Sequence, residues 1–481
     1  MAARLKTRAE FLLLIIFAVL NPIKSQYTPD WPSIDARPLP AWYDQAKIGI
    51  FIHWGVYSAP AKSNEWFGAE WFEWAYISGQ NYPGDGGTPG DPPGPGSPAL
   101  IEFMQNNYPP GTTYRDLAQD LTAESWNPDE WVTLFQNAGA KYVVLTSKHH
   151  EGFTLWPSAY SDPNWNSVDN GPHRDLVGDL AAATRRGGLR FGLYYSLCEW
   201  LHPLWLQDKR SGFSSNRFVE EVTMPKLYEV VNQYQPDVVW SDGEWSHDWY
   251  WNSTTFLAWL YNESPVKDSV VVNDRWGWDT TNTHGGFYSG QDRWNPGVLQ
   301  PHKWENCFTL DRYSWGFRTD NRFEDYMRPE EIISTMVESV SCGGNVLINV
   351  APTRNGSIPL IEQQLLGELG EWLGINGDAI YSSVPYEVQE DVTTDGVWYT
   401  SNALETVTYA IVTRLPTEDT PRIQLGSIPY AAGMTIQLLG NQGNLEYSCR
   451  IPCNDNPGIT VVLPPQNQIR SKYAWTLVIT R

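Results

Sequence analysis

Side chains that can bind a ligand or transfer a proton stand at the ends of six short apolar runs in this sequence. If these runs are parallel strands of a barrel, their carboxyl ends meet on one face, where barrel enzymes carry their chemistry. A single polar end would be explained as a cap, whereas six ends on one face predict a catalytic site. The run ends are His53-Trp54, Lys148-His149-His150, Tyr194-Tyr195-Ser196, Asp242, Asn273-Asp274-Arg275 and Glu305.

Paired carboxylates in this set suit glycoside hydrolysis, in which one carboxylate attacks or stabilises the anomeric carbon and the other protonates the leaving oxygen. Asp242 is the best candidate nucleophile, because it follows the apolar run VVW and precedes Gly243, which lets the chain turn and present the carboxylate. Its alternative role is a helix N-cap. Adjacent strand residues point to opposite faces, so His149 and His150 do not predict a metal site, and we expect at least one of them to bind a sugar hydroxyl. No G-x-S-x-G elbow offers a serine nucleophile.

The elements that must position these residues follow from the alternation of apolar runs with amphipathic stretches, which predicts parallel β/α units. Seven or eight units within residues 26–378 predict an α/β fold of the (β/α)8-like (TIM-type) barrel class. An open doubly wound sheet is the alternative, and the lack of a G-x-G-x-x-G loop weighs against it. Short strands without helices then predict an antiparallel β-sandwich over 379–481. Expected strands are 47–54, 141–150, 190–196, 237–242, 270–274, 302–307 and 345–350, and expected helices include 127–140, 174–188, 225–235 and 328–344.

Composition narrows the ligand class. The 481 residues carry a net charge of −22, which argues against nucleic-acid binding and against docking on anionic membranes. Tryptophan is abundant, with 25 residues, of which 22 lie between Trp31 and Trp315 in the predicted barrel. Large rings need burial or a flat apolar ligand face, so the excess indicates an aromatic core or a carbohydrate site.

The amino-terminal 25 residues predict a secretory signal peptide, with a basic start and an apolar run at 11–20 that is too short to span a bilayer. Three glycosylation sequons, at Asn252, Asn262 and Asn355, agree with passage through the secretory pathway. Residues 83–98 are mostly Gly and Pro and predict an exposed loop inserted in the barrel. The five cysteines do not form a disulfide framework, although Cys449 and Cys453 are close enough to close a small loop.

The chain resembles the α-L-fucosidases of glycoside hydrolase family 29, and the lysosomal (tissue) members of animals in particular. The resemblance covers nearly the whole predicted mature chain and rests on long segments. These are FIHWGVYS (51–58), EWF (65–67), AGAKYVVLTSKHHEGFTLWPS (138–158), PNWNSVD (163–169), GPHRDLVGDL (171–180), FGLYYSLCEWLHPLW (191–205), KLYEVVNQYQPDVVWSDGEW (226–245), VVVNDRWG (270–277) and HKWENC (302–307).

The resemblance implies hydrolysis of terminal α-L-fucose from glycans with retention of configuration, without a cofactor, by a homotetramer in the lysosome or outside the cell. Asp242 matches the family nucleophile, and a fucose-binding lectin that has lost catalysis is the alternative function. An aromatic wall would take the methyl and C–H face of this 6-deoxy sugar while His and Glu hold its hydroxyls. The residues that match the fucose pocket are His53, Glu65, Trp66, His149, His150, Tyr195, Trp240 and Arg275, with Trp315 as a further candidate.

The general acid/base has two candidates, because the family does not keep it at one motif. Glu305 lies near a strand end in HKWENC, and Asp292 lies in GFYSGQDRW on a loop that could fold over the site. A tryptophan flanks each of them, so their predicted environments do not separate them. We favour Asp292, because an acid on a mobile loop can approach the leaving oxygen after binding. The 83–98 insertion is longer than expected for the family, and it leaves the leaving-group preference open.

Overall fold

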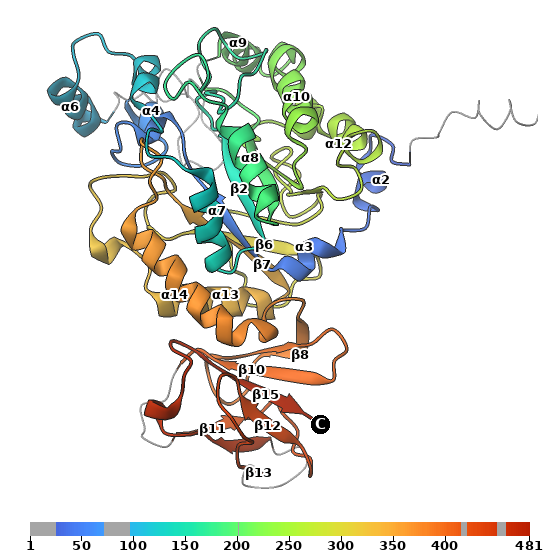
Figure 1. Cartoon of the computed structure of the whole chain (residues 1–481). Helices are drawn as coiled ribbons and strands as arrows, with labels where there is room; N and C mark the ends of the chain where they lie inside the picture. The colour runs from blue at the N-terminus through green and yellow to red at the C-terminus, as the bar shows by residue number, and fades with distance from the viewer. Residues whose placement is uncertain (1–25, 72–96, 201, 415–420, 450–457) are drawn as a thin grey trace, which may run out of the picture.

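The computed structural model describes residues 26–71, 97–200, 202–414, 421–449 and 458–481. A body of parallel strands and helices and a body of antiparallel strands follow one another along the chain and are stacked end to end in Figure 1. The predicted signal peptide (1–25) and nearly all of the 83–98 insertion lie outside the described residues. Within the described ranges, no helix is long and apolar enough to cross a membrane.

Seven parallel strands form the first sheet, in the order β5-β4-β3-β2-β1-β7-β6. Every residue of β1, β2, β6 and β7 is buried, because helices cover the outer face and side chains fill the inner one. Burial on both faces explains why the centres of β1, β2 and β7 are apolar, while buried polar residues of the strands, such as Glu305, are hydrogen-bonded. The strands are β1 Ile48–Ile52, β2 Tyr142–Lys148, β3 Arg190–Ser196, β4 Val238–Asp242, β5 Val271–Val272, β6 Trp304–Thr309 and β7 Gly344–Val350.

An irregular segment joins β5 to β6 where an eighth strand would stand. The backbone N–H of Phe287 donates to Val272 O of β5 at 3.1 Å. Tyr288 N donates to Lys303 O at 2.8 Å, and Tyr288 O accepts from Glu305 N of β6 at 2.8 Å. The predicted (β/α)8-like barrel is therefore confirmed, with seven regular strands in the described chain instead of eight.

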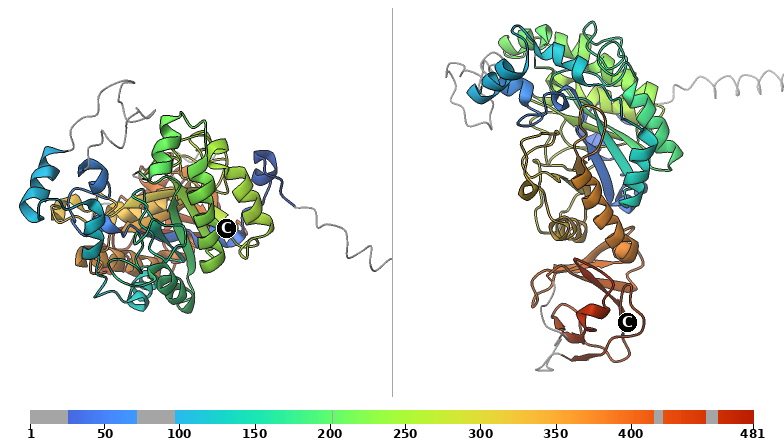
Figure 2. Two further views of the ribbon diagram at one scale, coloured as in Figure 1. Left: turned by 90° about the horizontal axis from the view of Figure 1, so that it is seen from above. Right: turned by 60° about the vertical axis from the view of Figure 1, so that its left-hand side comes forward.

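Helices surround the strands of this body (Figure 2). Their starts follow capping signals, since Asn127 Oδ1 accepts from Asp129 N at 3.1 Å before α7 and Asp175 Oδ1 accepts from Gly178 N at 2.8 Å in α8. The helices are α2 Trp31–Asp35, α3 Ala41–Ala46, α4 Phe67–Trp71, α6 Pro98–Asn107, α7 Pro128–Asn137, α8 Leu176–Arg186, α9 Pro203–Arg210, α10 Met224–Tyr234, α11 Asp248–Trp251, α12 Ser253–Asn262, α13 Pro329–Ser341 and α14 Leu360–Asn376. Short 3-10 helices are η1 Val56–Ser58, η2 Tyr114–Asp120, η4 Phe323–Asp325 and η5 Gly377–Ala379, and η3 Val219–Thr223 is a π-helix. A further 3-10 helix, η6 Gln466–Gln468, belongs to the second body.

The inside of the barrel is filled by aromatic side chains. Phe51 and Trp240 have ring centroids 5.3 Å apart, and Tyr194 stacks on Trp240 at 5.9 Å. All three are buried. Part of the tryptophan excess therefore belongs to the core of the barrel.

Beyond α14 the chain forms two antiparallel sheets, in the orders β12-β15-β10-β9-β8 and β11-β14-β13. Their apolar faces enclose a second core, so the predicted β-sandwich is confirmed. Trp372 of α14 ties this body to the first by donating from Nε1 to Ala474 O at 2.9 Å. The strands are β8 Val384–Glu390, β9 Val397–Ser401, β10 Val407–Val412, β11 Arg422–Leu425, β12 Thr435–Leu438, β13 Tyr447–Cys449, β14 Ile459–Val462 and β15 Trp475–Thr480.

Two of the three sequons, at Asn252 and Asn262, differ in accessibility. Asn252 is exposed in the left-handed turn after α11. Asn262 Nδ2, the atom that would carry a glycan, donates to Tyr27 O at 2.8 Å and to Ala258 O at 2.6 Å. Glycosylation of Asn262 would break that packing, whereas Asn252 is free to accept a glycan without rearrangement.

Two glycines of α14 provide a stability test. A Cβ on Gly370 would lie 1.9 Å from Asn137 O of α7, whereas a Cβ on Gly367 would meet nothing within 4 Å. We expect Gly370→Ala to lower the free energy of unfolding by about 1–3 kcal/mol through overpacking. Gly367→Ala is the matched control and should raise it by roughly 0.5–1 kcal/mol, because alanine favours the helix. Chemical denaturation of both variants measures the difference, and equal effects would contradict the close docking of α14 on α7.

Candidate active site

A cavity of about 210 Å³ opens at the carboxyl ends of the barrel strands, where the sequence predicts the site. Ten of the twelve predicted site residues line it, and Tyr195 and Glu305 do not. Four lining residues are outside that set of twelve: Phe51, Glu244 and Trp245, and Tyr194, which the sequence placed at a strand end. The complete lining is Phe51, His53, Glu65, Trp66, His149, His150, Tyr194, Trp240, Asp242, Glu244, Trp245, Arg275, Asp292 and Trp315.

Asp242 is the last residue of β4, and its carboxylate is held by donors on both oxygens. Tyr194 Oη donates to Oδ2 at 2.7 Å, and Arg275 Nη1 donates to Oδ1 at 3.0 Å. The chain turns sharply after it at Gly243, where φ is +66° and a Cβ would lie 2.6 Å from Ser196 Oγ. Only glycine tolerates both constraints, so the turn predicted from the sequence presents the carboxylate to the cavity.

Arg275 connects Asp242 to Asp292. Its Nη2 donates to Asp292 Oδ1 at 2.7 Å while Nη1 holds Asp242, so one guanidinium carries both carboxylates. Its cationic plane lies over the Trp240 ring, 4.7 Å from the centroid. Burial opposes the charge, but Asp292 and Asp242 outweigh it and raise the pKa of Arg275 well above its usual value. The Asp292 side chain is 46% exposed and that of Asp242 19%, so Asp292 lies toward the mouth of the cavity.

Two histidines present an unprotonated nitrogen to a ligand. Asn349 Nδ2 donates to Trp315 O, so its Oδ1 accepts from His53 Nδ1 at 2.6 Å. Likewise Ser196 Oγ donates to Cys198 O at 3.0 Å and accepts from His150 Nδ1 at 2.7 Å. Each Nε2 is then an acceptor for a hydroxyl.

The charge state agrees with this tautomer. Burial first, and His149 second, lower the pKa of His53 to about 3. The same two causes lower the pKa of His150 well below its usual value. Both shifts favour the neutral imidazole that this tautomer requires.

Glu65 joins two loops at the rim of the cavity. Its Oε2 accepts from the backbone N–H groups of Trp315 at 2.9 Å and Gly316 at 3.1 Å. Burial raises the pKa of Glu65, although these backbone donors act in the opposite direction. The contact sets the Trp315 ring against His53, with centroids 5.0 Å apart.

A second aromatic wall is formed by Trp66 and Trp245. Their ring centroids are 5.6 Å apart, and each ring also contacts His150, at 5.0 Å and 4.8 Å. Rings on both sides of a polar floor give the cavity apolar faces and hydrogen-bonding groups together. That combination suits a ligand with both C–H faces and hydroxyls.

Tyr195 corrects the sequence prediction. Neighbouring strand residues point to opposite faces, and on β3 it is Tyr194 that faces the barrel. Tyr195 points outward, where its Oη donates to Thr223 O at 3.3 Å and its ring contacts the Lys148 ammonium at 4.5 Å. The strand period identifies one of the two tyrosines as inward, but it does not say which until the register is known.

Glu305 is buried in the barrel interior and does not line the cavity. Its Oε2 accepts from Tyr43 at 2.7 Å and from Tyr142, and its Oε1 accepts from Trp240 Nε1 at 3.0 Å. Burial raises the pKa of this carboxyl. Glu305 therefore supports the Trp240 ring from the interior, which leaves Asp292 as the cavity-lining member of the two acid/base candidates.

Glu244 is a site residue that sequence reasoning missed, although it stands two positions after Asp242 in WSDGEW. It lines the cavity, and among the described residues no partner is found for its buried Oε2. Burial, and then the charge of Asp242, raise the pKa of Glu244 to about 8. The carboxyl is therefore neutral at acidic pH and has an unused polar atom.

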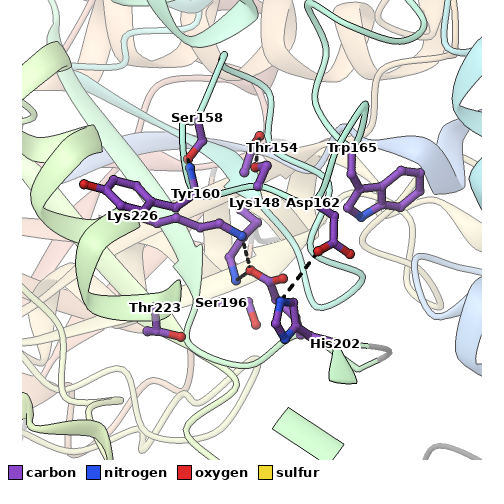
Figure 3. A network of polar contacts seen from close by, with 12 residues as sticks. Lys148, Thr154, Ser158, Tyr160, Asp162, Trp165, Ser196, His202, Thr223 and Lys226 are labelled. Atoms are coloured by element: carbon purple, nitrogen blue, oxygen red, sulfur yellow. Dashed lines mark hydrogen bonds and ion pairs between the residues drawn. The ribbon is translucent and has the colours of Figure 1, made fainter. Parts of the chain in front are cut away.

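A buried ion network includes Lys148 and Lys226 (Figure 3). Glu199 Oε1 accepts from Lys148 Nζ at 3.1 Å and from Lys226 Nζ at 2.6 Å. Despite burial, these two cations lower the pKa of Glu199 to about 2. The next residue, Trp200, donates from its backbone N to His150 O at 2.8 Å. The network thus anchors the loop after β3 that supports His150.

The cysteine thiols of the described chain are buried and poorly suited to act as nucleophiles. Cys198, Cys307 and Cys342 are buried free thiols, whereas Cys449 is disulfide-bonded and Cys453 lies outside the described residues. Burial raises the pKa of both the Cys198 and the Cys307 thiol, which disfavours a thiolate nucleophile. The described part of the chain contains no group of His, Cys, Asp and Glu arranged to hold a metal ion.

Known proteins share both the sequence and this architecture. Residues 15–378 match the Alpha-L-fucosidase family model, and residues 389–480 match the Alpha-L-fucosidase C-terminal domain model. The tissue alpha-L-fucosidase of Homo sapiens is 48% identical over 480 residues, covering 98% of this chain and 97% of that protein. The plasma alpha-L-fucosidase of Rattus norvegicus is 49% identical, covering 94% of each chain. The crystal structure of Thermotoga maritima alpha-fucosidase in complex with fucose superposes with a TM-score of 0.76 at 32% identity, covering 94% of this chain and 100% of that one. This chain belongs to the alpha-L-fucosidase family.

Proposed function

We propose that this alpha-L-fucosidase releases terminal α-L-fucose from glycoproteins, glycolipids and oligosaccharides by double displacement with retention, with Asp242 as nucleophile and Asp292 as general acid/base. The observation that carries the proposal is that one guanidinium, Arg275, binds both carboxylates at one cavity. Retaining enzymes need their two carboxyl groups only about 5–5.5 Å apart, so that one can attack while the other protonates. Two carboxylates on the two ends of one guanidinium suit that spacing.

In the first step, an Asp242 oxygen forms a bond to the anomeric carbon while the glycosidic C–O bond breaks. The leaving oxygen takes its proton from the protonated form of Asp292, and the products are a β-fucosyl ester of Asp242, the Asp292 carboxylate and the free aglycone. In the second step, Asp292 removes a proton from water, whose oxygen attacks the anomeric carbon and releases Asp242. Two inversions give α-L-fucose with net retention.

The walls of the cavity supply recognition. The neutral His53 and His150 offer Nε2 acceptors to hydroxyl groups, while Trp315 and Trp66 offer flat faces to the C–H surface and methyl group of fucose. Because the histidines carry no charge, they can accept hydroxyl hydrogens without repelling the positive charge that develops at the anomeric carbon. No cofactor is required by this scheme.

The wider setting is proposed from the relatives. The tissue and plasma alpha-L-fucosidases fit a secretory route, so we place this chain in the lysosome or outside the cell, with residues 1–25 as its signal peptide. The working form is a homotetramer, as the family resemblance implies. The alternative function is a fucose-binding lectin, which would not need two carboxylates held next to each other by one guanidinium.

The nucleophile is tested by Asp242→Ala. We expect loss of at least about 10³-fold in kcat on an aryl α-L-fucoside, because the covalent intermediate no longer forms. Added azide should restore turnover and give the β-fucosyl azide, identified by NMR, since azide attacks in the space left by the carboxylate. Wild-type turnover in this variant would overturn the assignment, and fucose binding without any hydrolysis by the unmodified protein would support the lectin.

The acid/base is tested by comparing Asp292→Ala with Glu305→Ala. Removal of the acid should cost about 10²–10⁴-fold in kcat on natural glycans and much less on aryl fucosides with very good leaving groups. Azide should rescue Asp292→Ala with an α-configured product. Glu305→Ala should lose thermal stability and activity on all substrates alike, because Trp240, Tyr43 and Tyr142 lose their acceptor. Azide rescue of Glu305→Ala alone would reverse the two roles.

Glu244→Gln tests the buried carboxyl through pH. The folded protein keeps this proton up to about pH 8, whereas the unfolded chain releases it near pH 4.5, so rising pH costs stability across that window. We expect Glu244→Gln to match the wild type in melting temperature below pH 4.5 and to exceed it increasingly toward pH 8. Glu362→Gln is the control, since burial also raises the pKa of Glu362 to about 8 but the residue does not line the cavity. Both should show the pH trend, and only Glu244→Gln should change KM.

A further inference from the structure

Two exposed tryptophans adjoin the cavity without lining it. Trp249 is 62% exposed and Trp278 is 43% exposed, whereas most tryptophans of the described chain are buried or half-buried. The edge of the Trp278 ring meets the His247 ring at 4.6 Å, and Trp249 stacks on the same imidazole at 5.8 Å. The three rings, Trp249, His247 and Trp278, form one contiguous surface cluster, named here the rim platform.

The rim platform is continuous with the cavity along two chain segments. Ser246, the residue after the lining residue Trp245, accepts from Trp278 N at 3.0 Å. Trp278 itself lies three positions after the lining residue Arg275. Both segments follow the carboxyl ends of strands, β4 and β5, so the platform stands on the same face as the site.

The Trp278 ring is held in place by polar contacts. Trp278 Nε1 donates to His247 Nδ1 at 2.8 Å. Asp279 Oδ1 accepts from Asp248 N at 3.1 Å, which fixes the chain segment next to His247. A ring that is fixed before binding loses little conformational entropy when a ligand covers it. The contact of two large indole rings with water is unfavourable. A flat apolar ligand face that covers the rings would remove that contact.

We propose that the rim platform binds the pyranose rings of the glycan from which fucose is removed, by stacking their C–H faces on Trp278 and Trp249. The cavity holds about 210 Å³, room for one terminal sugar, so the rest of the chain must lie outside it. The proposal rests on the proposed function, since it names the part of the same substrate that follows fucose. Fucosylated oligosaccharides gain from the platform, whereas fucosides with a small aryl group do not reach it.

The test compares two substrates on Trp278→Ala and Trp249→Ala. On 2′-fucosyllactose and on a core-fucosylated N-glycan, we expect kcat/KM to fall about 2- to 12-fold per ring, mainly through KM, which matches the usual worth of an aromatic contact. On a 4-nitrophenyl α-L-fucoside, kcat/KM should change less than twofold. Trp278→Phe should restore most of the oligosaccharide activity. Tyr430→Ala is the matched control, because Tyr430 is 44% exposed on the carboxyl-terminal body, far along the chain from the site.

Three outcomes would overturn the proposal. Equal losses on both substrates would mean that the tryptophans support the cavity, and no loss on either oligosaccharide would mean that no sugar stacks there. The third concerns Asn252, the exposed sequon residue three positions after Trp249. If the effect of the tryptophan variants disappears in an Asn252→Gln background, the rings hold the protein's own glycan. A wild-type protein that hydrolyses neither substrate would instead reject the proposed function itself.

Discussion

The contact between Arg275 and two carboxylates depends on a column of side chains that runs from the barrel interior to the cavity. Glu305 holds the indole N–H of Trp240, the Trp240 ring lies under the Arg275 guanidinium, and the guanidinium holds Asp242 and Asp292. Each layer positions the next one. A closed barrel is needed because Trp240 and Asp242 stand on β4 and Glu305 stands on β6, toward opposite edges of the seven-stranded sheet.

Desolvation gives this column its chemical character. Burial raises the pKa of Glu305. The hydroxyls of Tyr43 and Tyr142 and the indole N–H of Trp240 all donate to its carboxyl group. In the cavity, burial disfavours the charged form of both basic and acidic side chains. It keeps His53 neutral down to about pH 3 and Glu244 protonated up to about pH 8. Between those limits neither group changes charge. His53 and Glu244 therefore keep their hydrogen-bonding character over that range.

Much of the site could be predicted because it depends on the local order of residues along each strand. The turn at Gly243 needed only a glycine after an apolar run, and the convergence of strand ends followed from the barrel. The acid/base choice was harder, since Glu305 and Asp292 each stand beside a tryptophan. Only their burial separates them, and burial depends on contacts with Tyr43 and Tyr142, far away in the sequence.

Tyr195 and the eighth strand mark where local pattern was insufficient. Tyr194 and Tyr195 are neighbours on β3, so the strand period says that one of them faces the barrel but does not say which one. At the edge of the barrel sheet, β5 has only two residues. The backbone of Phe287 and Tyr288 bridges β5 to β6 and closes the barrel without regular strand pairing. That irregular closure leads directly into the loop that carries Asp292. A regular eighth strand would hold its carboxyl end rigidly in the barrel, whereas the irregular segment lets an exposed carboxylate reach Arg275 from the mouth of the cavity.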